Sequence, residues 1–324
     1  MPGENMERPR GQFLAVGETL IDLIVADGAT DLAVAGHFAA RPGGAPANVA
    51  VALTRLGLPA AFAGTVGDDP FGRRLAEALA AERVDVSRLA TVPTATTIAF
   101  AWKTMAGDGQ FWLLRNADLQ LSPSDIDRAS IDGLAALIVG SVALAGEPSR
   151  SAVLHAVALA AAAAVPVCFD INLRPSLWPN LQTATAVCEI VATSATLLKL
   201  SVDDAAGLFD SATDPVTIFD ACARVAPTAQ VVLTDGVRGS WYRDGRGVHH
   251  VPAWPVAAIE PTGAGDAFTA ALVKRLAERS WAPPCANDLR YAAAAGALAT
   301  TQPGAWDGLP TTPELDAFLA SRDG

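Results

Sequence analysis

The sequence predicts an α/β fold, in which a doubly wound, mostly parallel sheet is covered by helices on both faces and carries a small β-sheet lid. Short apolar runs alternate with helical patterns along most of the chain, a rhythm typical of parallel sheets. Two regions instead alternate apolar and polar residues, as antiparallel strands do. The 324 residues are 51% hydrophobic and only 18% charged, so the chain is long and apolar enough to bury a large core.

The main sheet follows from apolar runs that end at glycine or polar residues. Six such runs are expected to be strands: residues 13–16, 60–63, 136–139, 165–169, 197–200 and 231–234. Segments of helical composition predict helices at residues 47–56, 72–82 and 267–277, and from about residues 149, 203 and 217. Because strands and helices alternate, neighbouring strands are expected to run parallel, with helices on both faces.

The lid is predicted by the two alternating regions. Residues 20–25 with 33–39, and residues 96–103 with 110–115, are expected to pair as antiparallel strands, and residues 106–109 to form a hairpin turn. The alternative is an antiparallel extension of the main sheet. We expect a main α/β unit and a discontinuous lid, divided as follows: residues 11–19, 41–95 and 119–315 in the main unit, and residues 20–40 and 96–118 in the lid.

Composition argues against several classes of partner. The formal net charge of −11 disfavours nucleic acid and anionic membrane surfaces, because both repel an acidic protein. The first ten residues are polar, and the Ala-rich stretch 156–165 ends at Pro166, so neither a signal segment nor a membrane span is expected. The four cysteines are far apart and predict buried thiols in a reducing compartment. We therefore expect a cytoplasmic protein without a zinc site.

The most informative stretch is Pro261–Phe268, which reads PTGAGDAF. A glycine-rich turn that leads into a helix directs backbone N–H groups and the positive end of the helix dipole at one point, a place for an anion. Asp266 in the first helical turn could accept a proton from a hydroxyl that attacks a phosphoryl group held there. The plainer interpretation is an ordinary helix start, in which the dipole alone favours the Asp.

Five further polar features follow the predicted strands. These are Asp22 and the segments Arg41–Asn48, Asp170–Pro175, Lys199–Asp204 and Thr234–Gly239. Taken singly, each could be a surface loop or a helix cap, as Ser201 is expected to be. Together they fall beyond the carboxyl ends of strands, where open α/β sheets bind ligands. Asp204 is further expected to help hold Mg²⁺ through water.

Two long signatures give the chain a family resemblance. Residues 43–57 and 261–273 match the two signatures of the ribokinase-like (PfkB-type) carbohydrate kinases, and the chain resembles that family from Gly17 to about Leu309. The resemblance implies a doubly wound α/β fold with a β-sheet lid, and transfer of the ATP γ-phosphoryl group to a sugar or nucleoside hydroxyl with Mg²⁺. An Asp is already ionised at neutral pH, so the base requires no large pKa shift.

The resemblance also implies roles for single residues. Asp266 would be the catalytic base, Gly263, Ala264 and Gly265 the anion hole, and Arg174 a cation for the phosphate oxygens. The sugar would be held by Asp22, Gly43, Gly44, Asn48, Phe100, Arg115 and Asn172, together with Asp266. The nucleotide would contact Lys199, Thr234, Gly236, Gly239 and Ala293, together with Gly263 and Gly265.

Segments 17–22 and 111–118 are similar to fructokinases, and segment 175–178 is similar to both fructokinases and 2-keto-3-deoxygluconate kinases. Together they favour fructose as the acceptor. A 2-keto-3-deoxygluconate kinase, a ribose or nucleoside kinase and a non-catalytic sugar-binding regulator are the alternatives. The chain departs from the family at Glu260-Pro261-Thr262, where Asp-Thr-Thr is common, which makes a K⁺ requirement doubtful. It departs again at Ala293, where many relatives have Asn, and at Asp204, where Glu is usual.

The apolar residues of the lid strands predict a partner for the lid. Ile98, Phe100 and Trp102 would be exposed on a sheet one layer thick. Covering them with a second copy of the chain would bury that surface. We therefore expect a homodimer formed through the lid.

Overall fold

The computed structural model describes residues 11–105, 109–209 and 213–322. Within them, nine strands form one sheet in the order β13-β12-β11-β10-β9-β8-β1-β4-β5. Its parallel strands are β1 (Phe13–Val16), β4 (Ala60–Gly67), β5 (Asp85–Val92), β8 (Ala136–Gly140), β9 (Val167–Asp170), β10 (Leu197–Ser201) and β11 (Gln230–Thr234). The antiparallel strands β12 (Ser240–Asp244) and β13 (Gly247–Val251) complete one edge. The predicted parallel sheet is confirmed.

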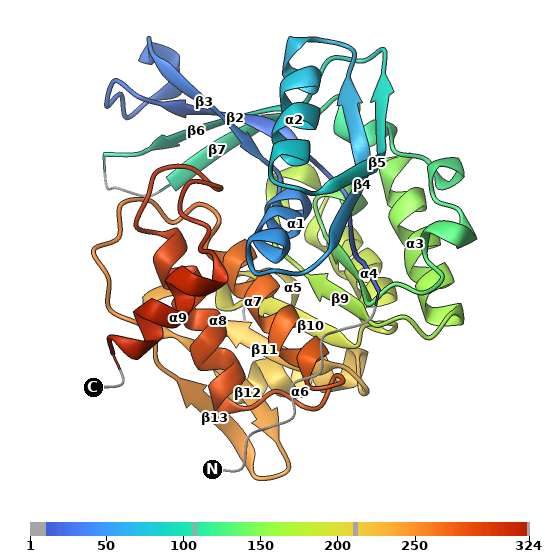
Figure 1. Cartoon of the computed structure of the whole chain (residues 1–324), viewed down its shortest axis with the longest axis vertical. Coiled ribbons are helices and arrows are strands. Elements are labelled where there is room, and N and C mark those ends of the chain that lie inside the picture. The colour runs from blue at the N-terminus through green and yellow to red at the C-terminus, as the bar shows by residue number, and fades with distance from the viewer. Residues whose placement is uncertain (1–10, 106–108, 210–212, 323–324) are drawn as a thin grey trace.

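Helices cover both faces of this sheet (Figure 1). One face packs against α1 (Ala45–Arg55), α2 (Pro70–Ala81), α7 (Ala264–Glu278), α8 (Ala286–Ala299) and α9 (Thr312–Ala320). The other packs against α3 (Ser149–Ala162), α4 (Leu181–Ala192), α5 (Val202–Leu208) and α6 (Pro215–Val225). Strand β1 shows why apolar runs identify such strands, because Phe13 and Ala15 belong to one core cluster and Leu14 and Val16 to the other.

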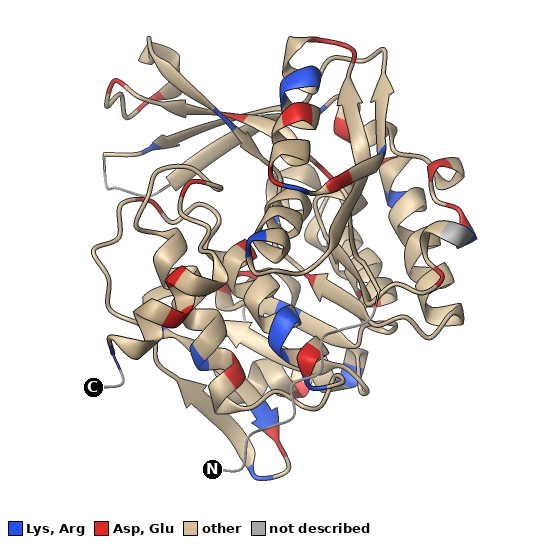
Figure 2. Ribbon diagram, in the orientation of Figure 1, with Lys and Arg blue, Asp and Glu red and all other residues tan. Residues whose placement is uncertain are grey.

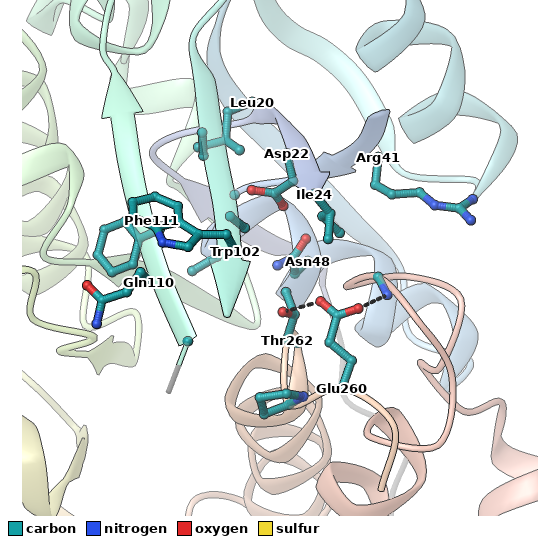
Figure 3. Close-up of a pocket in the computed structure, with 18 of the residues that line it drawn as sticks. Leu20, Asp22, Ile24, Arg41, Asn48, Trp102, Gln110, Phe111, Glu260 and Thr262 are labelled. Atoms are coloured by element: carbon teal, nitrogen blue, oxygen red, sulfur yellow. Dashed lines mark hydrogen bonds between the residues drawn. The ribbon is translucent and has the colours of Figure 1, made fainter. Parts of the chain in front are cut away.

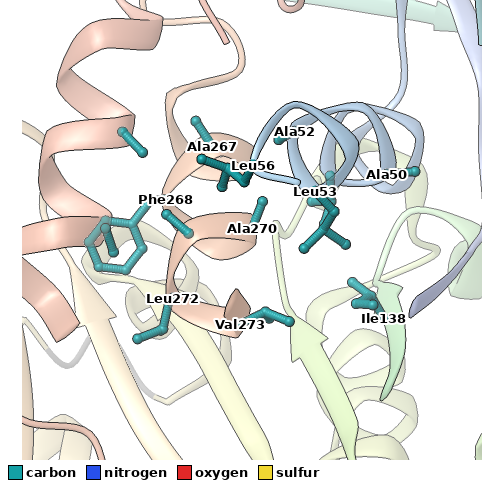
Figure 4. Packing of buried hydrophobic residues seen from close by; sticks show 14 of the residues in the cluster. Ala50, Ala52, Leu53, Leu56, Ile138, Ala267, Phe268, Ala270, Leu272 and Val273 are labelled. Carbon is teal, nitrogen blue, oxygen red and sulfur yellow. The ribbon is translucent and has the colours of Figure 1, made fainter. Parts of the chain in front are cut away.

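Small residues bring α1 and α7 close together, as Figure 4 shows. Ala50 and Leu53 of α1 and Ala267 and Ala270 of α7 belong to one cluster of buried side chains. Alanines leave little side-chain volume between the helix axes, so the two N-termini are held near each other. These are the helices that follow the two glycine-rich loops, and their packing therefore brings both loops to the same place.

A separate four-stranded sheet forms the lid, in the order β3-β2-β6-β7. It contains β2 (Leu20–Val25), β3 (Phe38–Gly43), β6 (Ile98–Lys103) and β7 (Gly109–Leu114). Figure 1 shows it projecting from the α/β body beside α1 and α2. The alternative of an extension of the main sheet is thus excluded for the described residues. The two hairpins are antiparallel as expected, but β2 and β6 pair in parallel.

The structure corrects the second strand of the lid. Residues 33–39 were the expected strand, whereas β3 spans Phe38–Gly43 and Leu32–Val34 form a short 3₁₀ helix capped by Asp31. Apolar composition favoured the earlier stretch, but pairing with β2 continues through Arg41 and Pro42. The lid sheet therefore runs past the expected boundary at residue 40, and the division into two units stays a prediction. Residues 106–108 of the expected turn lie outside the described residues.

Two carboxylates, Asp69 and the buried Asp118, hold the base of the β6–β7 hairpin. Asp69, the N-cap of α2, accepts hydrogen bonds from the backbone N–H and the hydroxyl of Thr96 (2.7 and 2.8 Å). Asp118 accepts from the Thr97 hydroxyl (2.5 Å) and from Arg115 Nε (2.7 Å). Both ends of the hairpin are therefore fixed where they leave the body.

Three features of the described residues bear on the expectations drawn from composition: the distribution of charge, the apolar length of the helices and the state of the cysteines. Figure 2 shows acidic and basic residues interspersed along the ribbon in this view. Among the described residues, no helix is both long enough and apolar enough to cross a membrane. The four cysteines are free, and Cys168, Cys188 and Cys222 are buried, as predicted for thiols in a hydrophobic core.

Candidate active site

A cleft of 1210 Å³ lies between the lid and the edge of the main sheet. The lid contributes alternate residues of its strands, among them Asp22, Arg41, Ala99 and Phe111, and the body contributes residues at the carboxyl ends of β1, β9 and β10. Figure 3 shows Asp22 and Asn48 on one side of this space, with Glu260 and Thr262 beside them. Residues far apart in the sequence are thus gathered at the edge where α/β sheets bind ligands.

The turn before α7 has the shape that the sequence predicted for an anion site. Gly263 adopts a left-handed conformation (φ +83°) immediately before the first helical residue, Ala264. A Cβ at Gly263 would lie 2.6 Å from the carbonyl oxygen of Ala305, so the position has no space for a side chain. Gly263, Gly265 and Asp266 line the cleft. The helix N-terminus therefore faces the cleft with its positive dipole end.

Asp266 is held by a hydrogen bond inside this site. It is 8% exposed, and Asn48 Nδ2 donates to its Oδ2 at 2.7 Å. Burial raises the pKa of Asp266 to about 6; the Asn48 hydrogen bond opposes this rise, Asp170 adds to it, and Lys199 and Arg174 oppose it. The site thus raises the pKa of this Asp, a shift that its expected role as a base does not require. A pKa below 7 still leaves most of the carboxyl ionised at neutral pH.

Asp22 lies directly over the first glycine of the other loop. A Cβ at Gly43 would be 2.0 Å from Asp22 Oδ2, so the position of this carboxylate depends on glycine there. Burial, and after it the nearby carboxylates of Glu260 and Asp266, raise the pKa of Asp22 to about 7. Gly44 is left-handed (φ +104°), and a Cβ there would lie 2.5 Å from the Glu18 carbonyl oxygen. Both glycines thus keep side chains out of the space next to the sugar-binding candidates Asp22 and Asn48.

Glu18 is a site residue that the sequence reasoning missed. It lines the cleft and is 2% exposed; its Oε1 accepts from the Ala45 N–H (3.3 Å), and its Oε2 has no hydrogen-bond partner among the described residues. Burial raises its pKa to about 7. A carboxylate two residues past a buried strand carries no periodic signal, so only its place in the Gly17–Asp22 segment could have indicated it.

Lys199 and Asp170 form a buried ion pair beneath the turn. Lys199 Nζ lies 3.0 and 3.1 Å from the two Asp170 oxygens, and the Thr269 hydroxyl donates to Asp170 Oδ2 at 2.6 Å. A Cβ at Gly265 would lie 3.3 Å from Lys199 Nζ, so the ammonium group adjoins the turn. Asp170 raises the pKa of Lys199 and offsets the lowering by burial. The pair therefore places a permanent cation at this end of the cleft.

Asn172 and Arg174 reach the same cleft from the segment after β9. Asn172 is left-handed (φ +45°), a conformation that Asn tolerates better than most residues. The Arg174 guanidinium carbon lies 5.0 Å from the centre of the Phe111 ring on the lid. This cation–π contact links the body to the lid across the cleft.

Several predicted site residues are not among the described residues that line the cleft. Phe100 stacks on Trp112 (5.8 Å) on the other face of the lid, and Arg115 is paired with Asp118 through Nη2 (2.6 Å). Ala293 is buried within α8. Their proposed contacts with sugar or nucleotide stay predictions, as do those of Thr234, Gly236 and Gly239 near the end of β11. Gly239 also has a local reason to be glycine, because a Cβ would lie 2.3 Å from the Val251 carbonyl oxygen.

Asp204 completes the predicted helix cap. Its Oδ2 accepts from the Ser201 N–H (2.8 Å), the Ser201 hydroxyl accepts from the Asp204 N–H (3.0 Å), and Asp204 Oδ1 accepts from the Leu173 N–H (2.7 Å). Both carboxylate oxygens therefore already have partners. The neighbouring Asp203 lines the cleft.

Comparison with known proteins gives these observations a family. Residues 11–312 match the model of the pfkB family carbohydrate kinases. Fructokinase-1 of Oryza sativa subsp. japonica is 37% identical over 95% of this chain and 97% of its own length. A double mutant of the Vibrio cholerae O395 fructokinase, solved with fructose, ADP and potassium ion, superposes with a TM-score of 0.84 at 33% identity, covering 97% of this chain and 99% of that one.

A third relative carries the nucleotide and its metal. A putative ribokinase II from E. coli, solved with ATP and Mg²⁺, has a TM-score of 0.85 at 26% identity and covers 96% of this chain and 99% of that one. These matches extend over almost the whole chain and agree with the α/β body, the separate lid and the two glycine-rich loops. The chain therefore belongs to the pfkB family of carbohydrate kinases and is an ATP-dependent carbohydrate kinase.

Proposed function

We propose that this kinase phosphorylates the primary hydroxyl of fructose and releases fructose 6-phosphate and ADP. The observation that carries the proposal is the placement of Asp266, a buried carboxylate in the first turn of α7 beside the left-handed Gly263 turn and the sugar-side residue Asn48. The fructokinases to which the chain is similar support fructose as the acceptor.

In this mechanism the residues of the cleft bind the sugar, accept a proton or stabilise the transferring phosphoryl group. Asp22 and Asn48 would bind hydroxyls of the sugar, and the Asp266 carboxylate would accept the proton of the attacking hydroxyl. The hydroxyl oxygen forms a bond to the γ-phosphorus while the bond from that phosphorus to the bridging oxygen of ADP breaks. The N–H groups of residues 263–265 and the Arg174 guanidinium would stabilise the negative charge on the transferring group. Lid contacts such as Phe111 would keep water away from the phosphoryl group.

Mg²⁺ would enter with ATP and neutralise charge on its phosphates. The carboxylates of Asp203 and Asp204 are of the kind that suits this ion, which prefers oxygen ligands and keeps several waters. Asp203 faces the cleft, whereas the Asp204 carboxylate would have to act through the lone pairs that its two hydrogen bonds leave.

K⁺ is bound in the similar Vibrio fructokinase, but we propose that it is dispensable here. Glu260 Oε1 accepts from the Thr262 hydroxyl (2.6 Å) and Oε2 from the Gly304 N–H (3.0 Å), as the dashed lines in Figure 3 show. This carboxylate joins the turn before α7 directly to the loop after α8. Equal turnover in KCl and in choline chloride at matched ionic strength would support this; strong activation by KCl would contradict it.

The alternatives within the family differ in what they need from the cleft. A 2-keto-3-deoxygluconate kinase needs a cation for the substrate carboxylate, and the candidate Arg115 is engaged by Asp118. The carboxylates Glu18 and Asp22 beside Asn48 suit a neutral polyol better than an anion. The same carboxylates and amide would also suit the hydroxyls of ribose or a nucleoside, which the acceptor panel below distinguishes. A non-catalytic regulator would be expected to lack an intact base and turn.

We further propose a homodimer through the outer face of the lid and a cytoplasmic location. Phe38, Trp112 and Leu114 lie on that face with 38%, 52% and 38% of their surfaces exposed, and Phe100 stacks on Trp112 and meets Phe38 edge-to-face. Ile98, Phe100 and Trp102, which were expected to be exposed, are half-buried, and Trp102 lines the cleft. A second copy would remove this apolar surface from water. The free cysteines suit a reducing compartment.

The test measures ADP release from Mg-ATP with fructose, 2-keto-3-deoxygluconate, ribose, tagatose and adenosine. The Asp266→Asn variant is expected to fold normally and to lose nearly all turnover, because the amide cannot accept the proton. Asp220→Asn is the matched control, because Asp220 is an exposed residue of α6 that pairs with Arg243 of β12. A strong response to another acceptor would replace fructose, and near-parental kcat in Asp266→Asn would overturn the assignment of the base.

A further inference from the structure

A tryptophan from the loop between α8 and α9 reaches the base through one intermediate side chain. Trp306 Nε1 donates to Asn48 Oδ1 at 2.7 Å, and Asn48 Nδ2 donates to Asp266 Oδ2 at 2.7 Å. Trp306 is 6% exposed and Asn48 4% exposed. Neither bond is explained by the sugar-binding role expected of Asn48, and Trp306 does not itself line the cleft.

The loop that carries Trp306 is fixed on both sides. Arg55 Nη1 donates to the carbonyl oxygens of Trp306 (2.7 Å) and Leu309 (2.9 Å), and the same guanidinium pairs with Glu82 (2.6 Å). On the other side the Gly304 N–H donates to Glu260, and the Ala305 carbonyl abuts Gly263. The indole therefore belongs to a rigid segment that contacts both α1 and the turn before α7.

The chemistry of the two side chains decides their orientation. An indole N–H can only donate, so the Asn48 atom that faces it must be the carbonyl oxygen. The amide NH₂ then has to point the other way, toward Asp266. Were the amide to rotate by half a turn, its oxygen would face a carboxylate and a donor would be lost from a buried anion, which is costly. The indole removes that alternative.

We infer that Trp306 is a positioning residue for the kinase reaction, which locks the Asn48 amide so that its N–H groups face Asp266 and the sugar. The inference rests on the proposed role of Asp266. It also gives Asn48 a double duty, since one N–H fixes the base while the other remains for the acceptor hydroxyl. The base and the sugar are thereby aligned by the same group.

One consequence is a change in the acidity of the base. The charged groups that act on Asp266 are Asp170, Lys199 and Arg174, with Asp22 and Glu18 on the sugar side. None of them changes when the indole N–H is removed. The Asn48 hydrogen bond lowers the pKa of Asp266, so losing its fixed orientation should raise that pKa.

The experiment uses Trp306→Phe, which removes the N–H and keeps an aromatic ring. Trp254→Phe is the matched control, because it removes an indole bond to the Arg290 carbonyl (3.0 Å) remote from the site. In Trp306→Phe we expect kcat to fall roughly tenfold, as for loss of one buried hydrogen bond. The KM for ATP should stay unchanged, and the acid limb of the kcat/KM profile should move to higher pH. Trp254→Phe should match the parent.

Combining substitutions separates positioning from simple packing. In an Asn48→Ala background, Trp306→Phe should have no further effect on kcat, because its route to Asp266 is already gone. Additive losses in the double variant would overturn the inference. So would parental kcat and pH profile in Trp306→Phe, or an equal loss in Trp254→Phe.

A measurement without turnover keeps this test independent of the proposed function. Carbon-detected NMR of the Asp carboxyl groups, assigned with Asp266→Asn, would give the pKa of Asp266 in parent and variant. We expect it to rise in Trp306→Phe whatever the acceptor proves to be. If that variant fails to fold, the parental Trp306 indole N–H resonance should titrate with the midpoint of Asp266 and be invariant in Asp266→Asn. An indole resonance whose chemical shift does not follow the titration of Asp266 would refute the coupling.

Discussion

Glu18 should make the stability of this protein depend on pH in a way that one substitution removes. Its carboxyl has a pKa of about 7 in the folded protein, against an ordinary value of 4.5. Between these values the folded state holds a proton that the unfolded chain has released. Raising the pH through this range therefore lowers the free energy of unfolding. Below pH 4.5 the effect is absent, and above pH 7 it is complete.

The size of the effect follows from the difference between the two pKa values. Each pH unit of difference corresponds to about 1.36 kcal/mol, so the parent should lose roughly 2 to 3 kcal/mol between pH 5 and pH 8 through this group. Because Glu18 is only 2% exposed, solvent screening reduces the figure little. Glu18→Gln keeps the shape but cannot ionise, so it should gain that amount relative to the parent at pH 8.

Urea unfolding of parent and Glu18→Gln at pH 5, 6, 7 and 8 measures this difference, with the exposed Glu77→Gln as control. In thermal melts the difference in Tm between Glu18→Gln and the parent should increase by roughly 5 °C between pH 5 and pH 8. A gap of the same size at every pH would mean that Glu18 does not titrate in this range. A difference that decreases as the pH rises would show that the ionised carboxylate has a stabilising partner. That result would contradict the structure, in which Glu18 Oε2 has no hydrogen-bond partner among the described residues.

Two further predictions concern the loop and the lid. Gly43→Ala should raise the KM for the sugar more than tenfold with little change in the KM for ATP, because a Cβ 2.0 Å from Asp22 Oδ2 displaces that carboxylate. Steady-state kinetics measure the two constants, and an unchanged KM for the sugar would refute the proposed role of Asp22. Trp112→Asp should convert a dimer to a monomer in sedimentation velocity, since it places a charge on the exposed apolar lid face; a parental protein that is already monomeric at micromolar concentration would contradict the dimer proposal.

The fold was largely predictable because its strands are buried on both faces. A run such as residues 136–140 is apolar throughout, since neighbours and helices leave no polar face. Strand β5 was missed because it pairs only with β4 at the edge of the sheet and keeps several half-buried positions. The register of β3 was misplaced since Arg41-Pro42-Gly43 has the composition of a loop.

The site was predictable where chemistry is written into a local pattern. The Pro261–Phe268 turn needs glycine for its backbone and carries the proposed base, Asp266, and both are visible in the sequence. Contacts that join distant segments leave no such pattern. Trp306 lies 258 residues from Asn48, and nothing in the local sequence of either residue indicates that they meet.

The anchoring of the lid at Thr96 and Thr97 decides where the lid can move. With Asp69 and Asp118 holding both ends of the β6–β7 hairpin, displacement would bend the strands beyond Ile98 and Leu114 instead of pivoting in the connecting loops. Bending moves the far end of a strand most and its base least. Asp22, paired with Ala99 one residue above that base, would stay almost fixed, while the entrance near Lys103 and Gly109 widens. Sugars could therefore enter and leave without displacing the residues proposed to bind them.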